Sequence, residues 1–309
     1  MSTECIMVKS IKLIGALIGL FLSTKVLAVA LPAQPTNPAD PGSASYRFNE
    51  VKRVPLTFNN QNGALYVPVM PGDAPLVLIA FAHGHVVPEI AYGAMYEHLA
   101  RKGFAVLFIP YDQVADTRDF KVMAEVYQTW VEKVVTAYPT VLSSRRVIYS
   151  GHSKGALVAS LAASLSSQPN RLVPHALVVF GLAGASPEQQ KIPKKTIITL
   201  VVGDQDNNTK PATSEKAFKL MRTEKKQLIL VSSYVGFQPE MIASHGSFRT
   251  LGLLGNQVGP LHWFSYWKFL VSAAWDIEKQ GNGTDPWLYG PGAFQTGTSL
   301  VNHITRVGF

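Results

Sequence analysis

Short, continuous runs of apolar residues recur along the chain and end in small or polar residues. They occupy positions 74–84, 105–112, 145–151, 175–184, 195–206 and 227–233. A run of this length without polar alternation is typical of a strand that is covered on both faces. The pattern therefore predicts a set of buried strands with a layer of helices on each side.

The segments between these runs have the spacing of helices. They span positions 92–104, 119–138, 154–165, 211–222 and 259–279. In the first of them, Met95, Leu99 and Phe104 fall on one side of a helix. Strands that alternate with helices form a parallel sheet joined by right-handed crossovers. We predict an α/β fold with a mostly parallel central sheet, helices on both faces, and an antiparallel hairpin from 53–58 and 64–69 at one edge.

Residues 1–30 lack this alternation and have the pattern of a secretory signal peptide. Lys9 and Lys12 precede a short apolar run at 13–22, and Ala-Val-Ala follows at 28–30. A basic segment, an apolar core and a site of small residues are the three parts of such a signal. The sequence therefore predicts export, to a secreted or periplasmic location.

We expect cleavage of this signal after Ala30, with Ala28 as the alternative. An uncleaved membrane anchor is the competing interpretation. The apolar run is short for a membrane span, and Lys25 interrupts its continuation. The expectation is therefore a protein without a stable membrane span once the signal is removed.

The composition of the remaining chain favours one large folded domain. The chain has 309 residues, of which 47% are hydrophobic and 16% charged, and this supports a large core. Residues 31–45 are rich in Pro, Ala and Ser and predict a flexible leader before a domain at 46–309. The only cysteine, Cys5, lies in the segment expected to be removed. A cysteine nucleophile and thiolate metal ligands are therefore excluded.

Charge adds little to this picture. The net charge is +8, and its basic residues are scattered apart from short clusters at Lys194–Lys195 and Lys225–Lys226. Nucleic-acid binding needs a concentrated basic face, so we expect no nucleic-acid partner. The sequence leaves the oligomeric state and the role of the tail at 280–309 open.

One pentapeptide carries the strongest chemical signal. Gly151-His152-Ser153-Lys154-Gly155 follows a predicted strand and precedes a predicted helix. Gly-x-Ser-x-Gly in this context is the pattern of a nucleophile elbow, in which a sharp turn exposes the serine oxygen and the glycines avoid collisions. A chance match of common residues is the alternative, but the strand and helix on either side favour the elbow.

A serine hydroxyl needs a base, and the base needs an orienting acid. In folds with this elbow, the chain order is serine, acid, then histidine. The loop after the strand at 195–206 offers Asp204 and Asp206, and we prefer Asp206 because it lies further out; either could instead simply form a turn. Three histidines follow in the chain. His245, in a loop, is the preferred base, and His262, which begins a helix, is the alternative.

The oxyanion of an acyl-transfer intermediate needs backbone N–H donors. One candidate is the N–H of Lys154, directly after the serine. The second should come from the loop after the first parallel strand. That loop reads Ala-His-Gly-His at 82–85, so Gly84 allows a close approach and His85 supplies the N–H. Two histidines without a third ligand do not make a metal site, and we expect neither metal nor cofactor.

Taken together, these motifs resemble secreted α/β-hydrolases. The segments "HGH" at 83–85, "GHSKGA" at 151–156, "VGDQD" at 202–206 and "ASHGSF" at 243–248 are similar to the chlorophyllase-like and cutinase-like (polyester hydrolase) branches. The resemblance spans roughly residues 50–280. It implies an α/β-hydrolase fold and an esterase or lipase that needs no cofactor.

The sequence therefore predicts a secreted serine hydrolase that cleaves carboxylic esters through an acyl-enzyme intermediate. The substrate would be a small-molecule or lipid-like ester, with its acyl length and natural identity open. A peptidase or acyltransferase with the same three residues is one alternative. A catalytically inactive binding protein of the same fold is the other.

Overall fold

The apolar runs form the centre of a nine-stranded sheet in the computed structural model, which describes residues 29–69, 75–112, 119–250, 257–279 and 304–307. Its strands are β2 (Val51–Phe58), β3 (Gln61–Pro68), β4 (Leu76–Ala82), β5 (Ala105–Ile109), β6 (Leu142–His152), β7 (Ala176–Phe180), β8 (Ile197–Gly203), β9 (Lys226–Val231) and β11 (Ile304–Val307). The order across the sheet is β11-β9-β8-β7-β6-β4-β5-β3-β2. From β5 to β9 all neighbours are parallel.

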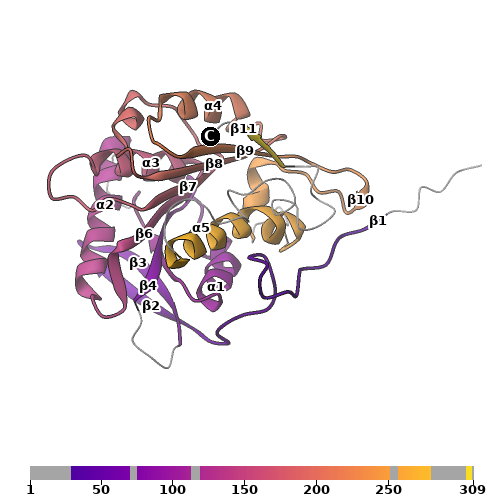
Figure 1. Ribbon diagram of the computed structural model, residues 1–309, viewed down its shortest axis with the longest axis horizontal. Coiled ribbons are helices and arrows are strands. Elements are labelled where there is room, and N and C mark those ends of the chain that lie inside the picture. Colours follow the sequence, from indigo (N-terminus) through magenta and orange to yellow (C-terminus); the bar gives the residue numbers. More distant parts are fainter. Residues whose placement is uncertain (1–28, 70–74, 113–118, 251–256, 280–303, 308–309) are drawn as a thin grey trace, which may run out of the picture.

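Helices cover both faces of this sheet (Figure 1). They are α1 (Gly93–Arg101), α2 (Phe120–Ala137), α3 (Lys154–Leu165), α4 (Pro211–Leu220) and α5 (Trp267–Lys279). One buried cluster joins α2, α3 and α4 to the sheet, and a second joins α1 and α5 to the opposite face. The predicted α/β architecture with a mostly parallel sheet is confirmed.

The predicted hairpin is also present, at the edge formed by β2 and β3. The two strands pair antiparallel along their whole length, with Phe58 opposite Gln61. Asn59 and Asn60 make the turn with φ angles of 53° and 60°. Two left-handed residues in a row match the right-handed twist of the strands, and asparagine tolerates that conformation well.

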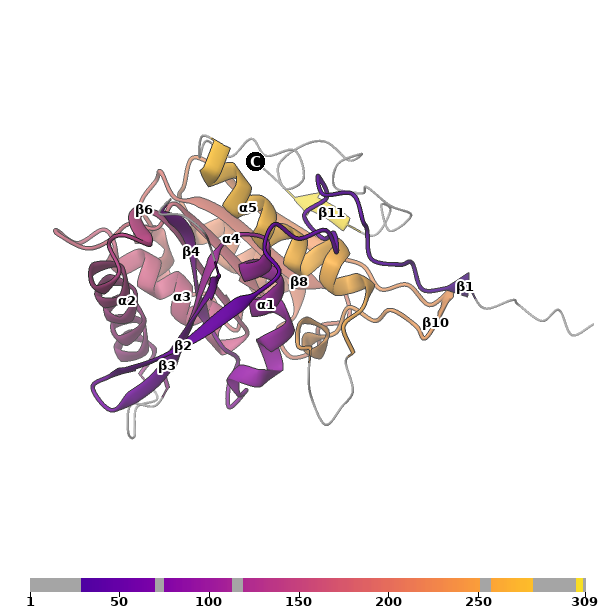
Figure 2. The same ribbon diagram turned by 90° about the horizontal axis from the view of Figure 1, so that it is seen from below.

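The segment predicted to be a flexible leader, 31–45, differs from that expectation because part of it packs onto the domain (Figure 2). A Cβ on Gly42 would lie 1.8 Å from the carbonyl oxygen of Trp263, so the two backbones touch. Lys102 is buried and donates from Nζ to the carbonyl oxygen of Ser45 at 3.0 Å. These contacts use backbone atoms and small residues, which leave no apolar periodicity in the sequence.

The predicted signal peptide lies almost entirely outside the described residues, as do Cys5 and positions 280–303 of the tail. Its last two residues form β1 (Val29–Ala30), which pairs in parallel with β10 (Phe237–Gln238) at the right of both views. Within the described part of the chain, no helix is both long and apolar enough to cross a membrane.

Candidate active site

The Gly-x-Ser-x-Gly segment is the tight connection between β6 and α3. Ser153 has a φ of 58°, a left-handed conformation that serine rarely adopts. A Cβ on Gly151 would lie 2.4 Å from the carbonyl oxygen of Gly155, and one on Gly155 would lie 2.1 Å from that of Ala82 in β4. Both positions therefore require glycine, and the turn holds Ser153 at the carboxyl end of the parallel strands.

Ser153, His245 and Asp206 form a continuous chain of hydrogen bonds. His245 Nε2 lies 2.8 Å from Ser153 Oγ, and His245 Nδ1 lies 2.8 Å from Asp206 Oδ2. Because a carboxylate only accepts, Nδ1 donates to Asp206 and leaves Nε2 to accept the serine proton. The three residues come from the elbow, from a 3₁₀ turn after β9, and from the loop after β8.

Asp206 is held as a buried carboxylate. Its Oδ1 accepts from the backbone N–H of Asn208 at 3.0 Å and of Thr209 at 2.7 Å. Its Oδ2 accepts from Thr209 Oγ1 at 2.7 Å as well as from His245. Burial raises the pKa of Asp206, but the hydrogen bonds from His245 and Thr209 outweigh burial and leave the pKa below its usual value.

The sequence did not single out Thr209. Its hydroxyl contacts both Asp206 and His245, because Oγ1 also lies 3.1 Å from His245 Nδ1. This hydroxyl restrains the carboxylate and the imidazole relative to each other. Only the distance of three residues from Asp206 could have suggested such a contact, and a threonine in a polar loop is otherwise unremarkable.

The two alternative residues are engaged elsewhere. Asp204 accepts from the backbone N–H of Ser233 at 2.9 Å and from its hydroxyl at 2.5 Å. His262 is buried between the N–H of Gly259, 3.0 Å from Nδ1, and the carbonyl of Arg249, 3.3 Å from Nε2. Burial lowers the pKa of His262 to about 4. Asp204 therefore links the loop after β8 to the segment after β9. His262 fixes the helical turn that leads into α5.

The two candidate oxyanion donors face the same cavity as Ser153. Lys154 is the first residue of α3, and His85 follows β4. Among the described residues, nothing accepts a hydrogen bond from the backbone N–H of either. Two unused N–H groups beside a serine hydroxyl can stabilise a developing negative charge.

A chain of hydrogen bonds connects His245 to the loop that carries His85. His152 Nε2 donates to the carbonyl of His245 at 3.0 Å, and His152 Nδ1 accepts from the Tyr92 hydroxyl at 3.0 Å. Tyr92 Oη in turn accepts from the N–H of Gly84 at 2.9 Å. Burial, with smaller effects of His245 and Arg249, lowers the pKa of His152 to about 3. The His152 imidazole therefore stays neutral, with Nε2 as the donor and Nδ1 as the acceptor.

His83 holds the other side of the same loop. Its Nδ1 donates to the carbonyl of Gly84 at 2.7 Å, and its Nε2 lies 3.1 Å from Asp112 Oδ1. The Tyr111 hydroxyl donates to the His83 carbonyl at 2.7 Å. Because the Gly84 carbonyl and the His85 N–H share one peptide plane, these bonds orient the candidate donor. No group of three potential metal ligands occurs among the described residues.

A cavity of about 710 Å³ opens above Ser153. The residues that line it are Gly84, His85, Val87, Phe120, His152, Ser153, Lys154, Ala183, Asn208, Thr209, His245 and Arg249. Apolar side chains, neutral polar side chains and two cations therefore surround the hydroxyl. A substrate of moderate size can reach Oγ and both candidate N–H donors from this space.

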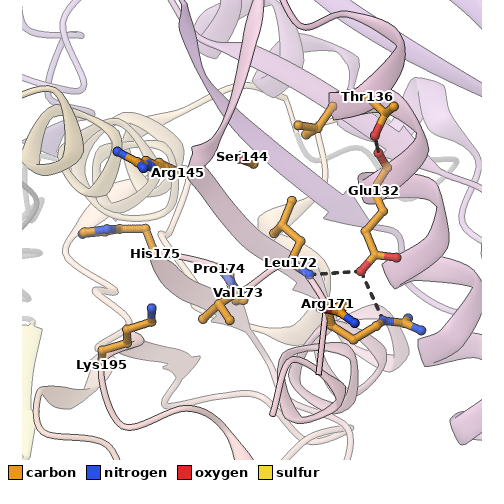
Figure 3. Close-up of a pocket in the computed structure, with 12 residues that line it drawn as sticks. Glu132, Thr136, Ser144, Arg145, Arg171, Leu172, Val173, Pro174, His175 and Lys195 are labelled. Atoms are coloured by element: carbon orange, nitrogen blue, oxygen red, sulfur yellow. Dashed lines mark hydrogen bonds and ion pairs between the residues drawn. The ribbon is translucent and has the colours of Figure 1, made fainter. Parts of the chain in front are cut away.

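A larger cavity, of about 900 Å³, lies at the opposite end of the sheet (Figure 3). Two of its charged groups pair with each other: Glu132 Oε1 lies 3.1 Å from Arg171 Nε in an ion pair and accepts from the N–H of Leu172 at 3.1 Å. Arg171 also pairs with Glu125 at 3.0 Å. None of the residues predicted to form the site lines this cavity.

Comparison with known proteins does not identify a family. No protein-family model and no curated protein matches the chain. The argument for function therefore rests on the site itself.

Proposed function

We propose that this chain is a serine hydrolase of the α/β-hydrolase fold that cleaves carboxylic esters. The observation that carries the proposal is the unbroken hydrogen-bond chain from Ser153 through His245 to Asp206, with Ser153 held in a strained turn. Strain of this kind lowers stability by about 1–3 kcal/mol and persists mainly at functional sites.

The order of the three residues along the chain supports the fold assignment. Ser153 follows β6, Asp206 follows β8 and His245 follows β9. This order of serine, acid and histidine beyond the carboxyl ends of successive strands is typical of α/β-hydrolases. It agrees with the resemblance to chlorophyllase-like and cutinase-like enzymes that the motifs suggest.

The geometry supports a two-step acyl transfer. In the first step, Ser153 Oγ attacks the ester carbonyl and its proton passes to His245 Nε2. The carbonyl oxygen becomes an oxyanion that accepts hydrogen bonds from the N–H groups of His85 and Lys154. As the ester C–O bond breaks, His245 returns the proton to the departing alcohol and an acyl-serine remains.

In the second step, a water molecule attacks the acyl-serine. His245 removes a proton from this water, and the same two N–H groups hold the new oxyanion. The bond to Ser153 Oγ then breaks, and His245 returns the proton to the serine. The products are the carboxylic acid and the free enzyme. Asp206 stays ionised throughout and stabilises the protonated imidazole.

The alternatives place different demands on the same residues. A peptidase or an acyltransferase would use the same acyl-serine, with an amide as substrate or an alcohol in place of water. An inactive binding protein would have no use for a serine in a strained turn with its hydroxyl on the base. Export, by contrast, rests on the sequence pattern of residues 1–30 alone and stays a prediction.

Labelling with a fluorophosphonate probe tests the proposal. The protein should react at Ser153, and Ser153→Ala should abolish both labelling and hydrolysis of 4-nitrophenyl esters, the latter by on the order of 10⁵ to 10⁶ in kcat. Ser167→Ala, an exposed serine beyond the far end of α3, is the matched control and should react normally. Labelling that persists in Ser153→Ala would overturn the assignment.

Turnover should be compared for peptides, for esters, and for esters with an added acceptor alcohol. Faster turnover of peptides than of esters would favour the peptidase. Transfer to an added alcohol in preference to water would favour the acyltransferase.

A further inference from the structure

The cavity above Ser153 carries an unbalanced positive charge. Of its described lining residues, the two with a permanent charge are Lys154 and Arg249, and none is a carboxylate. Asp206 lies behind His245 with only 4% of its surface exposed. Its charge faces the imidazole and its hydrogen-bond donors, so it does not neutralise the two cations in the cavity.

Arg249 is the cation with the least compensation. It follows the 3₁₀ turn that begins at His245, and it is half-buried in the cavity wall. No carboxylate of the described residues forms an ion pair with it. Its charge reaches the interior, where it contributes, after burial and His245, to the low pKa of His152.

Lys154 places a second charge on the other side of the serine. Its Nζ lies 5.8 Å from the centre of the Tyr111 ring. It also helps to lower the pKa of Asp112, against the effect of burial and after the larger effect of His83. Lys154 therefore lies in the electrostatic neighbourhood of a carboxylate, whereas no described carboxylate forms an ion pair with Arg249.

We propose that the substrate is a carboxylic ester that also carries a carboxylate, and that Arg249 binds this carboxylate. This inference rests on the proposed function. A guanidinium presents paired donors that match the two oxygens of a carboxylate. Lys154 and the N-terminus of α3 add to the positive potential around the bound anion.

The apolar part of the wall fits the rest of such a substrate. Val87, Phe120 and Ala183 line the same space and contact hydrocarbon without providing donors. A neutral, lipid-like ester would use these contacts but would leave Arg249 unpaired. The structure therefore favours an anionic ester over a neutral one, since the neutral ester gains nothing from the two cations.

The test measures the ratio of kcat/KM for an anionic ester to that for a neutral one. On the acyl side the pair is 4-nitrophenyl hydrogen adipate and 4-nitrophenyl hexanoate. On the alcohol side it is 4-acetoxybenzoate and 4-acetoxybenzamide. Each ratio is compared between the unaltered protein and its variants, so the intrinsic reactivity of the esters cancels.

Arg249→Gln should lower the ratio for at least one pair by about tenfold, as expected for the loss of a charge-assisted hydrogen bond. Arg222→Gln is the matched control, since Arg222 is exposed between α4 and β9 at the opposite end of the sheet. It should leave both ratios unchanged. Raising the salt concentration should lower the ratio of the unaltered protein.

A second measurement does not depend on folding of the variant. Adipate should inhibit hydrolysis of the neutral hexanoate ester by the unaltered protein more strongly than adipamide does. Equal inhibition, or ratios that Arg249→Gln leaves unchanged while the neutral esters are hydrolysed, would overturn the anionic substrate alone. If the unaltered protein hydrolyses none of the four esters, the proposed function fails and this inference fails with it.

Discussion

The two ends of the sheet differ in how their polar groups are used. At the amino ends of the strands, the larger cavity of about 900 Å³ is bordered by Glu132 and Arg171, which pair with each other. At the carboxyl ends, the smaller cavity of about 710 Å³ contains a strained serine and a guanidinium without a described carboxylate partner.

The comparison shows that cavity size is a poor guide to chemistry in this molecule. Paired groups such as Glu132 and Arg171 stabilise a fold but have little left to offer a ligand. Groups that stay available after folding, such as the N–H of Lys154 at the start of α3, are the ones that can act on a substrate. In parallel sheets such helix starts gather beyond the carboxyl ends of the strands.

After Ser153→Ala, the largest effect that sharpens this contrast should come from Asp206. Asp206→Asn should lower kcat by on the order of 10⁴, because an amide no longer fixes the donor tautomer of His245 or stabilises its charge. Asp204→Asn, two residues away, should have a much smaller effect, since Asp204 contacts Ser233 and not the base. Steady-state kinetics on a 4-nitrophenyl ester measures both, and the reverse ranking would transfer the role to Asp204.

Low pH should destabilise the protein through two buried, neutral histidines near the carboxyl ends of the strands. Burial lowers the pKa of His152 to about 3 and of His262 to about 4. The unfolded chain protonates both below about pH 6.5, so it binds more protons than the native state and stability falls as pH drops below that value. At pH 5 each histidine should lower the free energy of unfolding by about 2 kcal/mol relative to pH 8.

Urea unfolding at the two pH values tests this expectation. His262→Gln can still accept from Gly259 and donate to the Arg249 carbonyl, and it should remove about 2 kcal/mol of the difference between pH 8 and pH 5. If the free energy of unfolding of His262→Gln changes between pH 8 and pH 5 by as much as that of the unaltered protein, His262 is already protonated in the native state.

The smallest effect should follow from a substitution in the cavity at the amino ends of the strands. Glu132→Gln keeps the shape of the side chain but weakens its bond to Arg171, so the free energy of unfolding should fall by about 1 kcal/mol. Hydrolysis of a 4-nitrophenyl ester should stay at the level of the unaltered protein. A loss of activity comparable with that in Asp206→Asn would mean that the two ends are coupled and would break the comparison.

The strands, the helices and the serine turn could be predicted from the sequence because each rests on a local pattern. Continuous apolar runs marked β4 to β9, and Gly151 and Gly155 marked the turn around Ser153. The expected order of serine, acid and histidine reduced the candidates to two aspartates and the histidines that follow them. The preference for Asp206 over Asp204 could not be settled locally, since both follow β8. Contacts with distant residues separate them, because Asp204 accepts from Ser233 whereas Asp206 accepts from His245.

Apart from the contact of Thr209 with Asp206, the contacts that the sequence did not reveal join residues that are distant along the chain and share no motif. The hydrogen bond of Tyr92 with His152, and the contact of His83 with Asp112, join segments that no periodicity connects. The packing of Gly42 on Trp263 is of the same kind, because it depends on backbone surfaces. Such contacts depend on tertiary packing, which a pattern of residue types does not encode.

The backbone of Ser153 also has an evolutionary consequence. A left-handed φ of 58° suits glycine better than serine, so replacement by glycine would relieve strain and add stability. Random drift in a lineage that no longer needed the hydroxyl would therefore tend towards glycine at this position. Under the proposed function, selection for the hydroxyl acts against that drift and keeps serine at this position at the expense of a more stable fold.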